Sequence, residues 1–464
     1  MSYSSINLKS AISIIKGFDV NILKNVITTT CLTCVMSATA LADSDIYLTN
    51  NSNQAMSVTV KHTGSDLLQE GSEWQQHAQT LKPWETKMVL SFNRWEGIKS
   101  GDNYQFETLV TNENGESLSL LQQVKGYWYK SSLEHGASAN DLALNWADDR
   151  DTYRYLSQYN SNSTSTEIAF KASATGRYDD IHYTITPQKM DEQPEHDGNA
   201  LKVMSYNVWA LPVIASHIGE RLQEIPDHVK GYDVLMLQEV FAAGRGAFLR
   251  DLAKEYPYQT KMLDKSGVNV YDGGVTIVSR YPIVNEGQYV YPDCSGTDCF
   301  ADKGVNYAEV IKNGKAYHVL ATHTASFDTD TARDYRQRQF SQMREFAHTQ
   351  NIPVTDTVVY GGDFNVNKRK FPTDYQQMFA NLSANEPDFA GYTESTFDPR
   401  INAFAGSALS GGQNIEYLDY IVVSNEFAQR NENINTVKVP RTTVASLWKH
   451  WNLSDHFPVK AEIR

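Results

Sequence analysis

Carboxylate, amide and imidazole side chains recur in the second half of the sequence where apolar segments end. Segments 202–206, 233–238, 317–322 and 356–362 are each followed directly by such a residue. The set comprises Asn207, Glu239, His323, Asp363, Asn365, Asp419, Asp455 and His456. In sheet-based folds the strand ends of one edge are neighbours in space, so we expect these side chains to share one cleft.

This set suits metal-assisted hydrolysis of a phosphoryl compound. Glu239, Asn207 and Asp363 offer oxygen ligands, which a hard cation such as Mg²⁺ prefers. The metal would neutralise phosphate charge and stabilise a leaving oxygen. A histidine beside an acid can be held in one tautomer and accept a proton from water, and two histidines permit a base and an acid. Taken singly, an acid after a strand is most often a turn former, so only the order and spacing of the whole set indicate a site.

The elements around these residues indicate an α/β domain. After residue 199, apolar strands alternate with helical segments, for which we predict 217–230, 246–255 and 331–349. Residues 43–187 instead show short alternating segments broken by Asn, Ser and Gly, typical of an all-β sandwich. Segment 188–199 is polar, contains Pro and Gly, and is predicted to be a linker to a domain at 200–464.

Five of the eight tryptophans fall in the predicted sandwich, namely Trp74, Trp84, Trp95, Trp128 and Trp146. A sugar-binding or membrane-binding surface is one interpretation. Burial in the sandwich core is the commoner fate of such side chains, so no site is assigned to this domain.

The N-terminus and the cysteines indicate export. Residues 1–42 contain Lys9, Lys16 and Lys24 ahead of an apolar stretch that closes on Ala40-Leu41-Ala42, as in a secretory signal peptide. A soluble N-terminal helix is the alternative. In an exported protein Cys294 and Cys299 are expected to form a local disulfide. The formal net charge of −14 disfavours attachment to DNA or to an anionic bilayer by charge alone.

Seven ordered motifs in the second domain resemble those of the DNase I-like endonuclease/exonuclease/phosphatase superfamily. They are residues 203–209 (VMSYNVW), 237–241 (LQEVF), 272–275 (DGGV), 322–323 (TH), 362–365 (GDFN), 418–420 (LDY) and 454–458 (SDHFP). Within that superfamily, 272–279 (DGGVTIVS) and 361–368 (GGDFNVNK) are most similar to the secreted bacterial sphingomyelinase C hemolysins.

The resemblance implies a four-layer α/β sandwich and a secreted Mg²⁺-dependent phosphodiesterase, with Mn²⁺ or Co²⁺ as alternative ions. It would release phosphocholine from sphingomyelin as a peripheral, monomeric enzyme that damages membranes and does not act on nucleic acid. The resemblance also implies a role for each site residue. Glu239 and Asn207 would hold the metal, and His456 would be the general base, oriented by Asp419. His323 would be the acid or would stabilise the phosphorane charge, Asp363 and Asn365 would position water and phosphate, and Asp455 would support this network.

Two local features concern the lipid and a second metal. Trp448 and Trp451 lie just before the 454–458 motif, where these sphingomyelinases carry an aromatic membrane-contacting hairpin, so both are expected to contact the membrane. A core-packed corner is the alternative. The relatives also carry a peripheral metal site, but Tyr271 and Ala242-Ala243 occupy its positions here. Only Asp272 remains, which disfavours a second ion.

Two other functions remain open on sequence grounds. The same fold could cleave nucleic acid or a phosphoinositide, although the acidic chain and the tryptophans near residue 450 argue against a nuclease. A non-enzymatic membrane-binding toxin or adhesin is the third possibility, and the intact set of acids and histidines argues against it.

Overall fold

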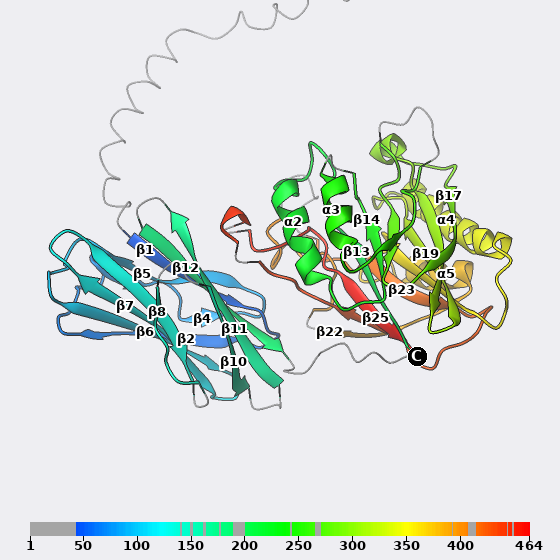
Figure 1. The fold of residues 1–464 in the computed structure, drawn as a ribbon. Coiled ribbons are helices and arrows are strands. Elements are labelled where there is room, and N and C mark those ends of the chain that lie inside the picture. The colour runs from blue at the N-terminus through cyan, green and yellow to red at the C-terminus, as the bar shows by residue number, and fades with distance from the viewer. Residues whose placement is uncertain are drawn as a thin grey trace, which may run out of the picture.

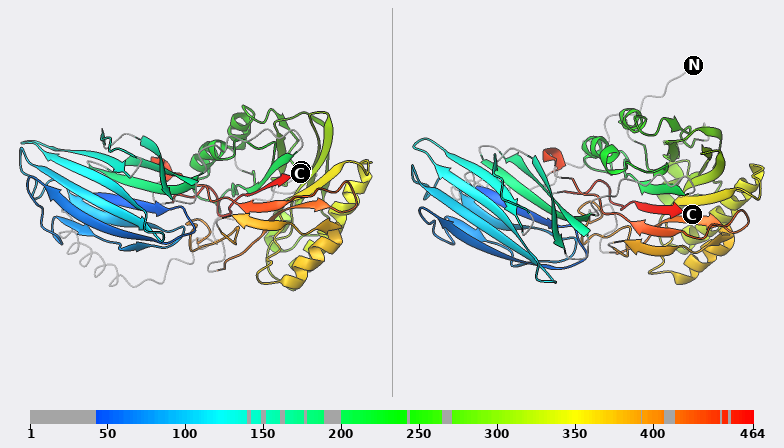
Figure 2. Two further views of the ribbon diagram at one scale, coloured as in Figure 1. Left: turned by 90° about the horizontal axis from the view of Figure 1, so that it is seen from below. Right: turned by 60° about the horizontal axis from the view of Figure 1, so that its bottom comes forward.

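The structure is a computed structural model that forms two lobes lying side by side (Figures 1 and 2). The described residues are 43–139, 142–148, 152–160, 164–175, 178–188, 200–241, 244–264, 271–391, 393–406, 414–442, 444–447 and 450–464. The predicted signal segment 1–42 and residues 189–199 of the predicted linker lie outside them, so both stay predictions. None of the described helices has the length and hydropathy needed to cross a bilayer.

The N-terminal lobe is the expected β-sandwich. One six-stranded sheet has the order β10-β11-β12-β1-β5-β3 and the other β4-β2-β6-β7-β8-β9. The strands are β1 (Asp43–Asn50), β2 (Met56–Gly64), β3 (Trp74–Gln76), β4 (Thr80–Leu81), β5 (Thr86–Asn93), β6 (Asn103–Asn112), β7 (Ser117–Gly126), β8 (Ser131–Ser138), β9 (Ala147–Asp148), β10 (Thr152–Asn160), β11 (Thr164–Thr175) and β12 (Tyr178–Gln188). Burial alternates along β6, where Tyr104, Phe106 and Val110 face the core. This period of two is the signal from which strands were predicted.

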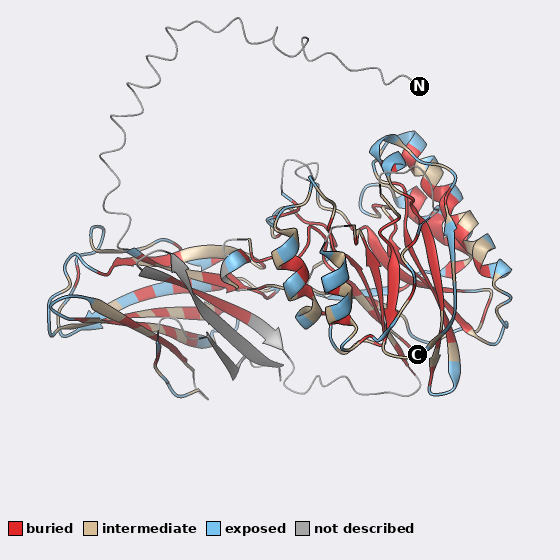
Figure 3. Cartoon of the chain, turned by 45° about the horizontal axis from the view of Figure 1, so that its top comes forward, coloured by how far each residue is buried: buried red, intermediate tan, exposed pale blue. Residues whose placement is uncertain are grey.

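The second lobe has four layers, as predicted. Its sheets have the orders β15-β16-β14-β13-β25-β24-β22 and β17-β18-β19-β20-β23-β21. The helices are α2 (Ile218–His228), α3 (Arg245–Leu252), α4 (Asp330–Thr349) and α5 (Pro372–Leu382), with 3-10 turns η1 (Gly296–Phe300) and η2 (Ala445–Leu447). The strands are β13 (Leu201–Asn207), β14 (Val234–Gln238), β15 (Tyr258–Gln259), β16 (Thr276–Ser279), β17 (Ile283–Val290), β18 (Gly304–Lys312), β19 (Lys315–His323), β20 (Thr357–Asp363), β21 (Ala384–Asn385), β22 (Asp388–Gly391), β23 (Asp419–Ser424), β24 (Ile434–Val437) and β25 (Val459–Ile463). The predicted helices at 217–230, 246–255 and 331–349 correspond to α2, α3 and α4, which begin and end within three residues of the prediction. Helices cover the outer faces of the sheets, and their buried sides face inward (Figures 1 and 3).

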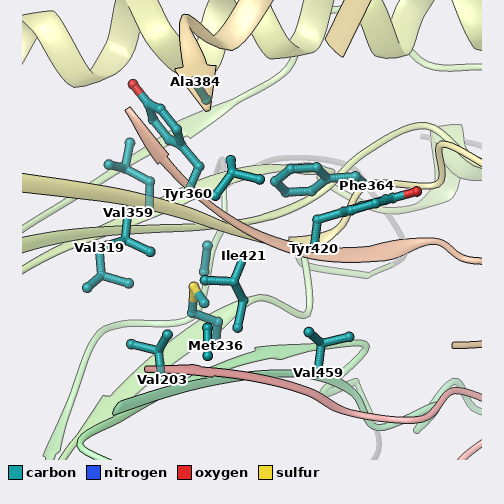
Figure 4. Close-up of a cluster of buried hydrophobic side chains, with 14 of the residues drawn as sticks. Val203, Met236, Val319, Val359, Tyr360, Phe364, Ala384, Tyr420, Ile421 and Val459 are labelled. Carbon is teal, nitrogen blue, oxygen red and sulfur yellow. The ribbon is translucent and has the colours of Figure 1, made fainter. Parts of the chain in front are cut away.

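An apolar core fills the space between the two facing sheets (Figure 4). Met236 of β14 reaches toward the second sheet, and a β-carbon on Gly361 of β20 would lie only 2.3 Å from its terminal methyl group. The neighbouring Gly362 has φ +150°, and a β-carbon there would lie 2.0 Å from the Thr322 carbonyl oxygen of β19. Glycines at both positions therefore let β20 pack closely against β14 and β19 just before Asp363.

Strand register brings the predicted site residues to one edge. β13 and β14 are parallel, with Asn207 opposite Gln238, so Glu239 follows directly beside it. β19 and β20 are parallel with His323 opposite Asp363, and the antiparallel β23 places Asp419 opposite Asp363. Because the two sheets face each other, both groups of strand ends border the same space.

The lobes meet at a packed interface to which loops and the strands β1 and β12 contribute. Trp84, between β4 and β5, is buried within the core cluster of the second lobe. Its carbonyl oxygen accepts a hydrogen bond from Arg441 Nη2 at 3.0 Å. Trp451 is 5% exposed, and its ring lies 3.9 Å from that of His182 in β12 and 6.2 Å from that of Tyr47 in β1.

Candidate active site

Asn207 links two buried carboxylates at the end of β13. Its Nδ2 donates to Glu239 Oε1 and to Asp363 Oδ2, both at 3.0 Å, while its Oδ1 accepts from the Trp209 amide. Glu239 has φ 57°, a left-handed backbone conformation that non-glycine residues adopt rarely. Such strain is concentrated at functional sites, where the surrounding structure maintains it.

His456 and Asp419 form a buried acid–imidazole pair. His456 Nδ1 lies 2.9 Å from Asp419 Oδ2, and because a carboxylate only accepts, Nδ1 carries the proton. Nε2 is then the basic atom of the neutral ring, and it lies 3.8 Å from Asp363 Oδ2. His456 is thus oriented to take a proton on the side of Asp363.

His323 faces the same carboxylate from β19. Its Nε2 lies 3.5 Å from Asp363 Oδ2 and 3.1 Å from Lys303 Nζ. Since an ammonium group can only donate, Nε2 accepts and the proton of the neutral ring is on Nδ1. Among the described residues Nδ1 has no hydrogen-bond partner. It is therefore a buried donor that the described residues leave unsatisfied.

Lys303 is a site residue that the sequence analysis did not identify. It is buried, and its Nζ also binds the Thr324 carbonyl at 2.8 Å, Ser326 Oγ at 2.6 Å and Asp298 Oδ1 at 3.1 Å. Asp298 lies within the short loop closed by the predicted disulfide between Cys294 and Cys299, which the structure confirms. No motif marks Lys303, which directly precedes β18 and is brought beside β19 by the pairing of Gly304 with His323.

The remaining predicted residues also lie at this edge. Asn365 has φ 51°, its amide donates to Asp363 Oδ1 at 3.0 Å, and its Nδ2 donates to the Thr324 carbonyl at 3.3 Å. Asp455 is buried, and its Oδ1 lies 3.2 Å from Ser454 Oγ. That hydroxyl lies 2.6 Å from the Asn207 carbonyl, which ties the two loops together.

Arg221 of α2 fastens the same loops from behind. Its guanidinium is fully buried and donates to the carbonyl groups of Val208, Trp209 and Leu453 at 2.7 to 2.9 Å. A guanidinium has five fixed donors, so one side chain can hold several carbonyl groups at once. The segments that carry Asn207 and His456 are thereby fixed to each other.

Burial and mutual charge shift the pKa values of the site in opposite directions. Burial lowers the pKa of His456, but Asp419, Asp363 and Asp455 outweigh it and raise that pKa well above its ordinary value. Burial, followed by Lys303, lowers the pKa of His323 to about 3. His323 is therefore neutral near pH 7, which favours a hydrogen-bonding role over that of a charged acid. Such divergent pKa values are typical of catalytic sites.

The donor set fits a hard divalent cation at Glu239. Burial, followed by the charge of Asp455, raises the pKa of Glu239 to about 7, and its Oε2 lacks a hydrogen-bond partner among the described residues. A cation bound there would satisfy this oxygen and favour its charged form. An oxygen ligand from Asn207 requires its amide to turn over, because Nδ2 now faces the acids. Asp363, Asp419 and His456 also offer ligand atoms within 4.8 Å of one another, but the His456–Asp419 hydrogen bond and the pairing of Asp363 with Asp419 across β20 and β23 account for that proximity.

The structure also describes some of the residues predicted to contact the membrane and some at the positions of the relatives' peripheral metal site. The expectation that Trp451 contacts a membrane is wrong for this structure, because its ring is buried against the sandwich; Trp448 lies outside the described residues. Asp272 binds Arg245 and accepts from the Gly274 amide at 3.1 Å, so it has the contacts of a turn residue. Ala242 and Ala243 are likewise outside the described residues.

Comparisons with known proteins agree with this geometry. Residues 204–456 match the Endonuclease/Exonuclease/phosphatase family. The chain is 35% identical over 299 residues to Sphingomyelinase C of Bacillus cereus, covering 57% of this chain and 89% of that protein. It is 32% identical over 310 residues to a Phospholipase C of Staphylococcus aureus, covering 60% and 91%. A crystal structure of a Staphylococcus aureus beta-toxin variant with bound magnesium ions superimposes with a TM-score of 0.51 at 34% identity, covering 56% of this chain and 98% of that one.

The family match lies wholly within the second lobe and includes every residue of the candidate site. The fold, the order of the motifs and the geometry of the site agree with it. The chain belongs to the endonuclease/exonuclease/phosphatase family, and within it to the group of the bacterial sphingomyelinases C.

Proposed function

We propose that this chain is a secreted, Mg²⁺-dependent phosphodiesterase that hydrolyses sphingomyelin to ceramide and phosphocholine. The observation that carries the proposal is the convergence of Asn207, His323 and His456 on Asp363 Oδ2, with Glu239 hydrogen-bonded to the same Asn207 amide. The similarity to sphingomyelinases C supports the choice of substrate, and the bound magnesium in the related beta toxin supports the choice of ion.

In this proposal His456 is the general base. Its Nε2 accepts a proton from the attacking water, while Nδ1–H stays hydrogen-bonded to Asp419 and stabilises the imidazolium that forms. Asp363 and Asn365 orient the water and the phosphate beside this nitrogen. Bound Mg²⁺, held by Glu239 and by Asn207 with its amide turned, would neutralise charge on the phosphate and at the leaving oxygen.

Lys303 provides positive charge beside His323, and the neutral His323 provides a hydrogen-bond donor. We assign the Nδ1–H group of His323 to a hydrogen bond with a phosphoryl oxygen that gains charge in the transition state. Lys303 fixes the tautomer that makes this donor available, and its charge adds to the stabilisation. Asp455 supports the network through Ser454, as the resemblance implies.

Export and membrane damage complete the proposal. The Cys294–Cys299 disulfide is typical of proteins that mature in an oxidising compartment, in agreement with the predicted signal segment. Removing the headgroup of a major outer-leaflet lipid would alter the host membrane, so lysis is expected to follow from catalysis.

The test is phosphocholine release from sphingomyelin liposomes by the purified chain, with Mg²⁺ and with EDTA. Phosphatidylcholine liposomes and plasmid DNA serve as parallel substrates. We expect release from sphingomyelin with Mg²⁺, its loss in EDTA, and no cleavage of DNA. Cleavage of DNA without lipid turnover would keep the fold and overturn the substrate, whereas release that persists in EDTA would overturn the role of the metal.

A further inference from the structure

Five large apolar side chains are exposed together at one end of the sandwich. They lie in the loops β2–β3, β5–β6 and β7–β8, and we call them the tip patch: Leu67, Trp95, Tyr127, Trp128 and Tyr129. Trp128 is 85% exposed and Trp95 is 58% exposed, which is unusual for indole side chains. Exposed apolar side chains that gather at one end of a domain can mark an interaction site.

The three loops are fixed to one another. Lys99 of the β5–β6 loop pairs with Asp66 beside Leu67. The Gly126 amide donates to the Asp102 carbonyl, and the Gly101 amide donates to the Gly126 carbonyl, both at 3.0 Å. Ser131 Oγ donates to the Arg94 carbonyl at 2.7 Å, next to Trp95. The tip patch is therefore a preformed surface, which reduces the entropy lost when it binds.

The tip patch lies away from the contact between the lobes. Trp84, which packs into the second lobe, precedes β5, whereas Trp95 follows it. The eight residues of β5 span about 26 Å at roughly 3.3 Å per residue. The β5–β6 and β7–β8 turns accordingly form the end of the sandwich that is remote from the second lobe (Figure 1).

The side-chain chemistry of the tip patch suits a bilayer surface. Indole and phenol rings prefer the boundary between headgroups and acyl chains. Lys130 Nζ lies 5.6 Å from the ring centroid of Tyr127 and 5.7 Å from that of Tyr129, so a cation accompanies the rings at the level of the phosphates. Trp128 and Tyr129 pack edge to face, with an interplanar angle of 63°, and so present a wedge rather than the flat platform on which a sugar ring stacks.

The charge of the protein disfavours an anionic bilayer and favours a zwitterionic one. The chain has a net charge of −14, which repels an anionic surface, and the β2–β3 and β5–β6 loops contain Asp66 and Glu96 as well as Lys99. We propose that the tip patch docks the protein on a zwitterionic, phosphocholine-bearing bilayer and so holds the enzyme at its substrate. The statement that this bilayer carries the substrate rests on the proposed function. Binding of the tip patch to the bilayer does not require lipid hydrolysis.

The test measures sedimentation of the full chain with sphingomyelin/phosphatidylcholine vesicles in EDTA, where no hydrolysis occurs. The variant is Trp95→Ala/Trp128→Ala/Tyr129→Ala, and the control is Tyr258→Ala, which removes an aromatic ring 40% exposed in the second lobe. We expect the triple variant to bind at least about tenfold more weakly, because its interfacial anchors are gone, and the control to bind like the wild type. If the triple variant does not fold, Trp128→Ala alone is measured.

The outcomes separate this inference from the proposed function. Hydrolysis of a soluble phosphocholine ester should be unchanged in the triple variant, because the tip patch is remote from the site. If the wild-type chain binds vesicles but hydrolyses nothing, the docking stands and the proposed function fails. Unchanged vesicle binding by the triple variant overturns the proposed docking. A preference of the wild-type chain for phosphatidylserine vesicles, or binding that requires a surface glycan, overturns the choice of a zwitterionic bilayer. A change of oligomeric state in the triple variant would show that the tip patch binds another copy of the chain instead.

Discussion

Two regions of this molecule contain tryptophans that differ in burial. Trp451, in the segment 441–453, is 5% exposed and packs against His182 of the other lobe. Trp128, in the β7–β8 turn, is 85% exposed and contacts only the edge of Tyr129 among the ring contacts of the described residues. The same side chain therefore joins the lobes in one region and is available to a partner in the other.

The difference matters because the segment 441–453 leads directly to the base. Arg441 donates to the carbonyl groups of Trp84 and Ile401, and the Thr442 amide donates to the Trp451 carbonyl at 2.9 Å. Leu453 is held by Arg221, and Ser454 precedes Asp455 and His456. The interface is thus continuous with the catalytic loop, whereas the tip patch has no such connection to the site.

The largest expected effect belongs to the metal ligand, which neither tryptophan region touches. Glu239→Gln removes the charge of the unpartnered carboxylate, and we expect kcat/KM on sphingomyelin vesicles to fall by about 10²- to 10⁴-fold, since a bound cation stabilises the transition state by several kcal/mol. A Mg²⁺ titration checks this, with the exposed Glu286→Gln as the control. A Glu239→Gln enzyme within tenfold of the wild type would contradict the assignment.

Asp419→Asn should reduce turnover less, by about 10²-fold, because the base remains but loses its orientation and its counter-charge. The catalytic form of His456 is neutral, so activity rises as pH passes upward through its pKa. Asp419 contributes to raising that pKa, and its replacement should move the acid limb of the pH–rate profile to lower pH. An acid limb that stays in place or moves to higher pH argues against this pairing.

The two tryptophan regions should differ sharply in stability. Trp451→Ala leaves a cavity between the lobes and should lower the free energy of unfolding by about 3–5 kcal/mol. Trp128→Ala removes an exposed ring and should change it by less than about 0.5 kcal/mol. Thermal melts and denaturant midpoints of both variants provide the comparison. If both variants lost the same free energy of unfolding, the burial of Trp451 would not contribute to stability as expected.

A smaller effect concerns pH at the interface. Burial, with a contribution from Arg441, lowers the pKa of His182 to about 3, so the folded chain holds it neutral. The unfolded chain would protonate it near pH 6.5. Its contribution to stability is therefore complete above pH 6.5 and is lost as pH falls toward 3. In His182→Gln the loss of stability across this range should be smaller than in the wild type; an identical pH profile would exclude the role.

The catalytic edge could be predicted from sequence because its residues follow directly from strand ends. Once the strands pair as the apolar segments indicate, register places Asn207 beside Glu239 and His323 beside Asp363, and the facing of the two sheets brings these groups together. Lys303 was missed because no motif marks it, although the pairing of β18 with β19 places it beside His323, where its Nζ lies 3.1 Å from Nε2.

Exposure of the tryptophans could not be predicted because it depends on packing between distant segments. Trp451 is covered by His182, which lies far away in sequence, and nothing near residue 451 encodes that contact. Trp95 and Trp128 lie in loops rather than strands, so the rule that sandwich aromatics are buried did not apply to them. That rule holds for Trp84, although the core that buries it belongs to the other lobe.

The most direct test of the account replaces the base and follows both lipid turnover and membrane binding. His456→Ala is compared with the wild type for phosphocholine release from sphingomyelin vesicles in Mg²⁺, and for sedimentation with the same vesicles. We predict a loss of turnover of about 10²- to 10⁴-fold with vesicle binding unchanged, because acid–base groups contribute that much and the tip patch is intact. Turnover within tenfold of the wild type in the folded variant would contradict the assignment of His456 as the general base.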